Sequence, residues 1–145
     1  LGICLGMQLL FSTSNETGLQ ANLSKKINKN EEIKGLNLIS GNFLNLKNID
    51  KKIIIPNIGW SKIYNNKKKT YNKYFNKLGN MINKKYYFSH SFFSQCNEPV
   101  EAQYIILKNK KIAASVAKDN ICGLQFHPEI SGVQGHKILK NFSRI

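Results

Sequence analysis

The sequence predicts an α/β fold, in which helices flank a sheet, and three observations support this prediction. The chain opens on an apolar run, Leu1–Cys4, that passes directly into residues with helical spacing. Its middle holds several short runs with the mixed apolar and polar pattern of strands. It closes on Val133–Phe142, which has the pattern of an amphipathic helix. The length of 145 residues is enough for one domain with a sizeable core.

The N-terminal part predicts a strand, a helix and a loop. Leu1–Cys4 is expected to be the end of a buried strand and Gly6–Phe11 the start of a helix. Ser12–Asn15 and Gly18 are typical residues for the end of a helix. The polar stretch Asn22–Gly35 predicts a loop. Because the chain begins inside an apparent strand and without methionine, we expect it to lack the strands that precede this one.

The remainder of the chain predicts strands and a final helix. The strand candidates are Gly41–Lys47, Trp60–Tyr64, Lys84–Ser89, Gln103–Leu107, Lys111–Ala117 and Ile121–Phe126. Lys108–Lys110 is expected to be a hairpin connection, and Gly123 is expected to break the last strand. The residues of the final helix expected to face inward are Ile138, Leu139 and Phe142.

The charge balance is strongly basic, with 22 Lys and Arg against 8 Asp and Glu, a formal net charge of +14. Alone, this indicates an anionic partner such as nucleic acid. However, only Arg144 is an arginine, and lysines alternate with asparagines, as in Lys26–Asn30 and Asn65–Lys69. We attribute the charge to composition bias and expect no nucleic-acid partner. Because Lys67–Tyr87 mixes lysines with aromatic residues, a basic binding module stays open as a lower-ranked alternative.

Other compositional features restrict the class of protein. No apolar run approaches the ~20 residues of a membrane span, and the apolar N-terminus lacks the basic residue that opens a signal peptide. We therefore expect no membrane partner. The three cysteines match neither a disulfide framework nor a zinc site. We expect no metal or other cofactor, and a reducing, cytoplasmic location.

The segment Gly2–Gly6 has the form G-x-C-x-G of a nucleophile elbow, a sharp turn from strand to helix. Glycines are needed where the strand and helix backbones approach closely. The N-terminus of the helix would favour the thiolate of Cys4, and the N–H of Leu5 would be placed to donate to an oxyanion. The alternative is that Cys4 is a small buried apolar residue, which we rank lower.

A cysteine nucleophile needs a histidine base and a group that orients it. His127 follows an apolar strand, at the sheet edge where α/β folds hold ligands. Pro128 fixes its own φ, and in an extended segment Glu129 would point to the same side as His127. Alternatively, His127 is an ordinary strand-end histidine and Glu129 a solvated charge, but the two together favour a catalytic pair.

The other histidines and cysteines are weaker candidates. His90 follows another strand and is a candidate for contact with substrate, whereas His136 is expected to face solvent. Cys96 is expected in a loop, and Cys122 is expected to pack within a strand.

Two segments, Leu1–Phe11 and Gly123–Glu129, resemble the two signatures of the class I, triad-type glutamine amidotransferases. Gly35–Gly41, Ile55–Trp60 and Tyr87–Phe92 resemble the glutaminase subunits of imidazole glycerol phosphate synthases in histidine biosynthesis. The resemblance implies a flavodoxin-like three-layer sandwich with a central mixed sheet. Residues 1–145 would then be a partial domain that lacks the N-terminal strands and the loop supplying a second oxyanion donor.

The resemblance also implies a reaction. Cys4 would attack the side-chain amide of L-glutamine, with Leu5 N–H holding the oxyanion. His127 would protonate the departing ammonia and then activate water, and Glu129 would orient His127. Gln8 and the backbone around His90 and Ser91 would bind the substrate.

Ammonia would pass to a (β/α)8 cyclase subunit in a heterodimer, which makes imidazole glycerol phosphate and an aminoimidazole carboxamide ribotide. Asn57, Gly59 and Trp60 would lie near that interface, and Ile130 at the ammonia gate. Ile130 stands where the family often has lysine, and Asn57 where it has histidine. The chain as given is expected to be inactive or unfolded in isolation, and glutaminase activity without the cyclase is expected to be weak.

Two other enzymatic roles stay open on the same fold. Relatives of this subunit supply ammonia for amination in surface-glycan biosynthesis, and a γ-glutamyl hydrolase would act without a synthase partner. The segments around Trp60 and His90 favour the amidotransferase over the hydrolase.

Overall fold

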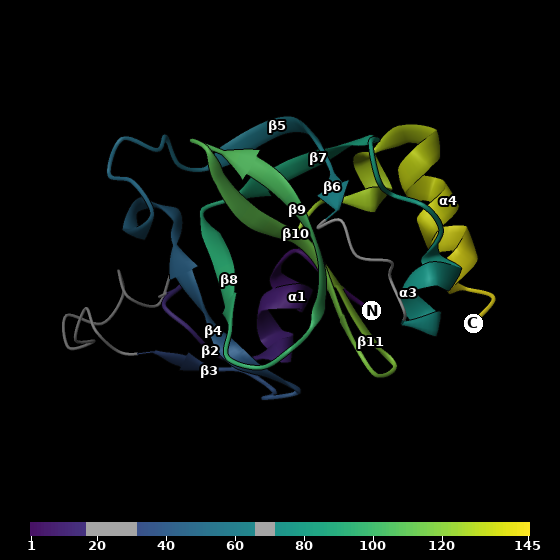
Figure 1. The fold of residues 1–145 in the computed structure, drawn as a ribbon, viewed down its shortest axis with the longest axis horizontal. Coiled ribbons are helices and arrows are strands. Elements are labelled where there is room, and N and C mark those ends of the chain that lie inside the picture. The colour runs from purple at the N-terminus through teal and green to yellow at the C-terminus, as the bar shows by residue number, and fades with distance from the viewer. Residues whose placement is uncertain (17–31, 66–71) are drawn as a thin grey trace, which may run out of the picture.

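The structure, a computed structural model, describes residues 1–16, 32–65 and 72–145 (Figure 1). Several sequence features therefore lie partly or wholly outside the described residues. They are Gly18, most of the predicted loop Asn22–Gly35, the run Lys26–Asn30, most of Asn65–Lys69 and the first residues of Lys67–Tyr87.

The largest sheet has five strands and is mixed. In spatial order they are β1 (Gly2–Ile3), β11 (Ile121–Leu124), β10 (Lys110–Lys118), β9 (Glu101–Leu107) and β6 (Tyr64–Asn65). β1 pairs with β11 in parallel, whereas the other neighbouring pairs are antiparallel. The single parallel pair is the one that positions the candidate site.

Two smaller sheets and three α-helices complete the described fold. The first small sheet holds β3 (Ile33–Lys34), β2 (Phe11–Ser14), β4 (Ile39–Asn45) and β8 (Phe92–Cys96), and the second holds β5 (Asn57–Lys62) and β7 (Lys85–His90). The helices are α1 (Leu5–Leu10), α3 (Lys73–Leu78) and α4 (Gly132–Phe142), with 3₁₀ turns η1 (Leu46–Asn48) and η2 (Pro128–Ile130).

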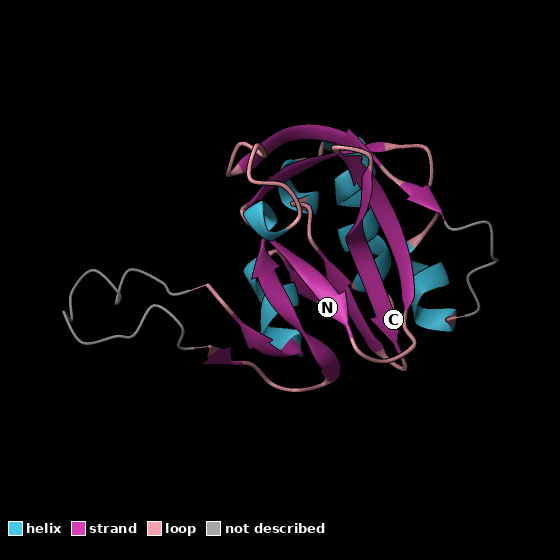
Figure 2. Ribbon diagram, turned by 60° about the vertical axis from the view of Figure 1, so that its left-hand side comes forward, coloured by secondary structure: helices cyan, strands magenta, loops and turns pink. Residues whose placement is uncertain are grey.

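Strand β10 lies between two apolar cores. It is buried over six successive residues, Ile112–Ala117, as a strand covered on both faces must be. One core contains Met7, Leu10, Phe11, Ile39, Phe43, Ala113 and Val116. The other includes Phe75, Leu78, Phe88, Ile112, Leu124, Phe126 and Ile138. Helix α1 thus covers one face of the sheet, and α3 and α4 the other, which confirms the predicted α/β class (Figure 2).

Several predicted elements are confirmed with shifted ends. The hairpin joins β9 to β10 through Lys108 and Asn109, whose φ angles of 47° and 61° suit a tight two-residue turn. The predicted first strand, the strand before His90 and the final helix are all present. No helix within the described ranges is long and apolar enough to cross a membrane.

Five expectations about elements are wrong. The predicted loop Asn22–Gly35 contains strand β3 (Ile33–Lys34), which pairs with β2. The first helix ends at Leu10, because Phe11–Ser14 forms strand β2 and pairs with β3 and β4. Gly123 does not break its strand but pairs on both sides. A Cβ there would come 2.7 Å from Met7 Cγ, so the glycine lets α1 pack on β11. Cys96 ends strand β8 and is not in a loop, and Phe142 is exposed.

Helix α3 was not predicted, although its ends carry clear signals. Asn72 is the N-cap, and its side-chain oxygen accepts hydrogen bonds from the N–H groups of Tyr74 and Phe75. Gly79 follows the helix with φ of 100°. Phe75 and Leu78 are buried, so two apolar side chains in six residues are enough to hold this short helix against the core.

Candidate functional site

The parallel pair β1 and β11 brings two distant segments to one edge of the sheet. Ile3 lies opposite Leu124, and the N–H of Cys4 donates to Leu124 O at 2.7 Å. Both strands end at this point, so Cys4 and Gln125 leave the sheet together. The carboxyl ends of parallel strands are where α/β folds bind ligands.

Cys4 occupies the sharp turn that the sequence predicts. Its φ of 48° and ψ of −105° are unusual for a residue with a side chain, and such strained conformations cluster at functional sites. A Cβ on Gly2 would lie 2.5 Å from Gly6 O, so Gly2 must be glycine for the strand to meet the helix. The same requirement was expected of Gly6 and is wrong there, because a Cβ on Gly6 meets nothing within 4 Å.

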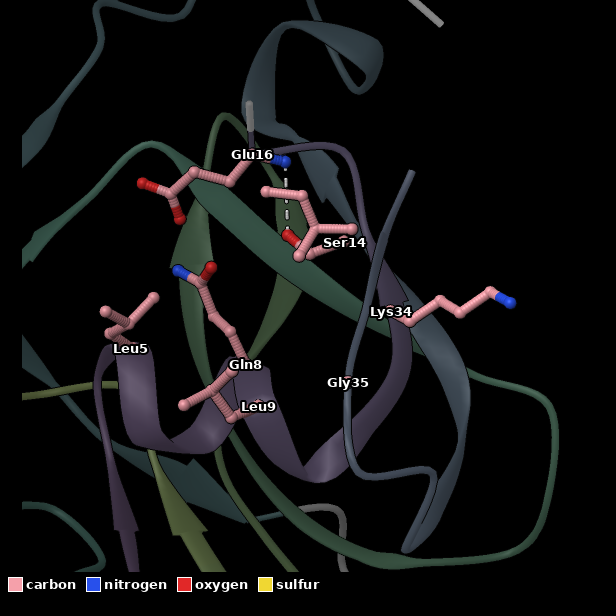
Figure 3. A pocket seen from close by; sticks show the side chains of 8 residues that line it. Leu5, Gln8, Leu9, Ser14, Glu16, Lys34 and Gly35 are labelled. Atoms are coloured by element: carbon pink, nitrogen blue, oxygen red, sulfur yellow. Dashed lines mark hydrogen bonds between the residues drawn. The ribbon is translucent and has the colours of Figure 1, made fainter. Parts of the chain in front are cut away.

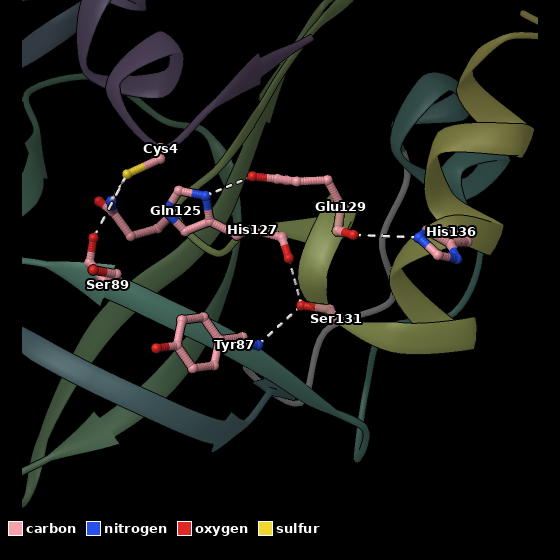
Figure 4. A network of polar contacts seen from close by, with 8 residues as sticks. All are labelled: Cys4, Tyr87, Ser89, Gln125, His127, Glu129, Ser131 and His136. Atoms are coloured by element: carbon pink, nitrogen blue, oxygen red, sulfur yellow. Dashed lines mark hydrogen bonds and ion pairs between the residues drawn. The ribbon is translucent and has the colours of Figure 1, made fainter.

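The thiol of Cys4 is half-buried and has three polar neighbours. Its Sγ donates to Ser89 O at 3.8 Å and accepts from Gln125 Nε2 at 3.9 Å (Figure 4). The backbone N–H of Leu5 also faces the sulfur and lowers its pKa. Burial outweighs these donors and raises the pKa of Cys4 above its ordinary value. The expected effect of the helix N-terminus on the thiolate therefore has the predicted direction, through Leu5 N–H, but burial outweighs it in the resting protein.

His127 and Glu129 form the pair that the sequence predicts. Nδ1 of His127 lies 2.7 Å from Glu129 Oε1. The argument from an extended segment is wrong, because Pro128–Ile130 forms the 3₁₀ turn η2, with Pro128 at its first position. The turn folds the carboxylate back onto the ring. Since a carboxylate only accepts, Nδ1 carries the proton in this contact, which leaves Nε2 of a neutral ring free to act as a base.

The backbone around His127 is fixed to strand β7. The N–H of His127 donates to Tyr87 O at 2.9 Å. Ser131 Oγ donates to His127 O at 2.6 Å and accepts from Tyr87 N–H at 2.9 Å. These three bonds hold the turn in place, so the position of the imidazole does not depend on a free loop (Figure 4).

Cys4 and His127 face the same space without touching. Figure 4 shows the His127 ring between the Glu129 carboxylate and the Cys4 side of the site. The negative charge of Glu129 is close enough to contribute to the raised pKa of Cys4. Among the described residues no hydrogen bond joins the thiol to the imidazole; the thiol proton instead faces Ser89 O. Catalytic bonds of this kind often form only with substrate bound.

His90 is buried, and both of its ring nitrogens are used. Nδ1 lies 2.7 Å from Phe92 O and therefore donates, because a carbonyl only accepts. Nε2 then accepts from Asn57 Nδ2 at 3.0 Å. Burial, together with the nearby charge of His127, lowers the pKa of His90. The side chain of His90 is thus a neutral support between two strands, with both ring nitrogens already bonded.

Gln8 lines a cavity of about 220 Å³ beside the elbow (Figure 3). The residues that surround it are Leu5, Gln8, Leu9, Ser14, Glu16, Ile33, Lys34 and Gly35. Gln8 is buried, and its Oε1 has no hydrogen-bond partner in the described part of the chain. A buried acceptor without a partner is costly, so it indicates a position where a ligand can donate.

Three of the expected interface residues, Asn57, Gly59 and Trp60, lie on strand β5. Its exposure alternates, so Ile58 (60% exposed) and Trp60 (54%) share an open face, whereas Asn57 and Gly59 are half-buried. Ile130, at the end of η2, is 53% exposed. The carbonyl of Ser91, expected near substrate, accepts from Leu46 N–H at 2.9 Å.

The remaining cysteines and His136 lie outside this constellation. Burial raises the pKa of Cys96 to about 11, and Cys122 packs in the core as expected. His136 is exposed, as expected, and its Nε2 donates to Glu129 O at 3.2 Å. Within residues 1–16, 32–65 and 72–145, no group of three or more His, Cys, Asp or Glu side chains could hold a metal ion.

Three residues near the site were given no role from sequence: Ser89, Gln125 and Ser131. Ser89 acts through its backbone carbonyl, which accepts from Cys4 Sγ, and Ser131 acts through hydrogen bonds that hold the backbone of His127. The sequence has no pattern that predicts either contact. Gln125 did carry one, because it stands two residues before His127 and so on the same side of an extended segment.

A family model, Glutamine amidotransferase class-I, matches residues 1–145 of the chain. The chain is 36% identical over 142 residues to "Imidazole glycerol phosphate synthase subunit HisH" of Lactococcus lactis subsp. lactis, covering 98% of the chain and 60% of that protein. Proteins of the same name from Caldanaerobacter subterraneus subsp. tengcongensis and Pyrococcus furiosus are 37% and 35% identical to the chain. The alignments cover all of the chain and 61% and 64% of those proteins. The chain thus spans about three-fifths of the length of the first two.

Proposed function

The chain belongs to the class-I glutamine amidotransferase family, and on this premise we propose that it is part of a glutaminase subunit that hydrolyses L-glutamine to glutamate and ammonia. The observation that carries the proposal is the joint arrangement at one sheet edge. Cys4 sits strained at a strand-to-helix turn, and His127, bound to Glu129 at 2.7 Å, faces the same space. This is the order of nucleophile, base and orienting acid that triad hydrolysis needs.

The proposed reaction has two halves. In the first, Cys4 Sγ bonds to the γ-carboxamide carbon while its proton passes to His127, which delivers it to the leaving nitrogen. Ammonia departs and a γ-glutamyl thioester remains. In the second, His127 takes a proton from water, the hydroxyl oxygen attacks the thioester carbon, and sulfur leaves with that proton as glutamate is released. Glu129 stabilises the charged form of His127 in both halves.

The site offers groups for the remaining roles. We propose that Leu5 N–H, which faces the sulfur in the resting protein, donates to the oxyanion that forms when Sγ bonds to the carboxamide carbon and again when water attacks the thioester. Gln8 and the backbone at His90 and Ser91 would bind the polar groups of glutamine, with the unpartnered Oε1 of Gln8 as an acceptor. Residues 1–145 would form part of one amidotransferase domain, in which further residues supply the second oxyanion donor.

We further propose that the ammonia passes to a (β/α)8 cyclase subunit, as in histidine biosynthesis. The relatives are named as subunits of imidazole glycerol phosphate synthase. Their names favour the cyclase as the ammonia acceptor over an enzyme of glycan amination. The open apolar face of β5, with Ile58 and Trp60, and the exposed Ile130 near the triad, suit contact with such a partner. The three free thiols support a reducing, cytoplasmic location.

The test is glutamate release by the full chain together with its cyclase partner and the cyclase's substrate. We expect Cys4→Ala to abolish glutamate release and Cys122→Ala, which removes a buried thiol of the core, to retain it. Release that persists in Cys4→Ala would refute the proposal. Hydrolysis of γ-glutamyl peptides at full rate without any partner would instead favour the γ-glutamyl hydrolase.

A further inference from the structure

Among the described residues, Gln125 is the one whose side chain is hydrogen-bonded to the reacting sulfur, and it has no part in the mechanism above. It is 0% exposed, and its backbone N–H donates to Ala114 O at 2.8 Å. Its side-chain Nε2 lies 3.9 Å from Cys4 Sγ. Its Oε1 is buried and has no hydrogen-bond partner within the described residues.

The other neighbours of the sulfur show why the contact with Gln125 matters for the charge on Cys4. In the resting protein the thiol donates to Ser89 O. When the proton leaves, the Ser89 carbonyl dipole faces a negative sulfur and repels it. His127 receives this proton, but in the part of the chain described no hydrogen bond joins its ring to the sulfur in the resting protein. The donors that face the sulfur are Gln125 Nε2 and the backbone N–H of Leu5.

We propose that Gln125 is a further catalytic residue of the glutaminase reaction, whose amide donates to Cys4 Sγ and stabilises the negative charge that develops there as the proton leaves. This inference rests on the function proposed above. A hydrogen bond to an ionised acceptor is stronger than one to its neutral form, so the contact favours the thiolate over the thiol. In agreement, the contacts with Leu5 N–H and Gln125 lower the pKa of Cys4, whereas burial and the charges of Glu16 and Glu129 raise it.

The Leu5 donor does not make Gln125 redundant. In the proposed reaction Leu5 N–H also donates to the oxyanion, so it is not reserved for the sulfur. Gln125 has no such second role, because its Nε2 points at the thiol and its Oε1 has no hydrogen-bond partner among the described residues. It therefore remains on the sulfur when the thioester breaks and negative charge returns to Cys4.

The test is the pH dependence of Cys4 alkylation by iodoacetamide in the full chain, followed by mass spectrometry of the Cys4 peptide. Gln125→Met keeps the length of the side chain and removes the donor. We expect the alkylation midpoint to move to higher pH, with about threefold to tenfold slower alkylation below it. Gln103→Met is the matched control, because Gln103 is also a buried glutamine but bonds Ser115. Its midpoint should equal that of the wild type.

Two outcomes overturn the inference. If the Gln125→Met profile coincides with that of the wild type, the contact has no effect on the charge. If its midpoint falls, then Oε1 and not Nε2 faces the sulfur. Since alkylation needs no glutamine, the result is independent of whether the chain is a glutaminase, which glutamate release tests separately.

A measurement on the unmutated chain covers the case in which Gln125→Met does not fold. The side-chain amide protons of Gln125 should shift in an NMR titration with the same midpoint as Cys4 alkylation, whereas those of Gln103 should not. Amide resonances of Gln125 that stay constant through that midpoint would equally overturn the inference.

Discussion

Ile3 lies directly opposite Leu124 in the only parallel pair of the largest sheet, although the two residues are far apart in the chain. The pairing places Cys4 and Gln125 side by side as both strands end, and His127 two residues further along. Without this register, the elbow and the histidine turn would be unrelated motifs. The candidate site therefore depends on the pairing of β1 with β11, which brings its side chains together.

Replacing Gly2 should damage this junction far more than replacing Gly6. In Gly2→Ala the new Cβ would lie 2.5 Å from Gly6 O, a backbone atom that cannot move without shifting α1. We expect a loss of about 1–3 kcal/mol in the free energy of unfolding. Gly6→Ala meets open space in a helix and should gain about 0.5–1 kcal/mol. Urea unfolding checks both; equal effects would contradict the close approach.

Glu129→Gln should lower kcat for glutamate release by about 10²–10⁴-fold and leave KM nearly unchanged. The amide keeps the shape of the carboxylate but cannot stabilise an imidazolium at Nδ1, 2.7 Å away. Glu98→Gln is the matched control, because Glu98 pairs with Lys118 at 2.9 Å and does not contact the triad. A drop in KM alone, or an equal effect of the control, would contradict the role of Glu129.

The buried, neutral His90 should make folding sensitive to acid. Its pKa is lowered in the folded state, so the unfolded chain binds more protons as the pH falls below about 6.5. The stability that depends on neutral His90 is complete above that pH and is lost as the pH falls toward the folded-state pKa. Replacing His90 by glutamine should flatten this loss, whereas His136→Gln, at an exposed position, should not. Free energies of unfolding from pH 7.5 to 5 test this, and parallel curves for wild type and His90→Gln would contradict it.

Trp60→Ala should weaken binding of the proposed cyclase partner by about 30-fold or more, since exposed tryptophans at interface centres carry much of the binding energy. Trp60 is 54% exposed on β5 and packs edge-on against Tyr87, with ring centroids 6.0 Å apart. Ile54→Ala is the control, because Ile54 is even more exposed but lies outside this strand. Titration calorimetry measures both, and equal affinities would place the interface elsewhere.

The sequence alone predicted much of the site but less of the fold. The G-x-C-x-G segment and the His-Pro-Glu segment are local signals, because their geometry follows from a tight turn and from neighbouring residues. By contrast, β2 and β8 were missed, since Ser-rich and Asn-flanked strands become strands through pairing with distant partners such as β4. The raised pKa of Cys4 could not be predicted either, because it results from burial against segments remote in the chain.

The role of His90 shows the same limit. Its position after a strand marked it as a contact for substrate, yet its ring is held by Asn57 across β5 and β7. Such a cross-strand bond depends on the register of two strands, which local sequence does not define. The structure thus gives a role to the asparagine at position 57, where the family has histidine: its side-chain amide donates to the neutral imidazole of His90.

The central claim, that Cys4 is the nucleophile for glutamine, is tested most directly by covalent capture. A glutamine analogue with a diazoketone in place of the carboxamide should alkylate the full chain, and peptide mass spectrometry should find one adduct, on Cys4. Excess L-glutamine should protect it, and His127→Ala should slow the labelling. An adduct on Cys96 or Cys122 in place of Cys4, or labelling that glutamine does not prevent, would contradict the account.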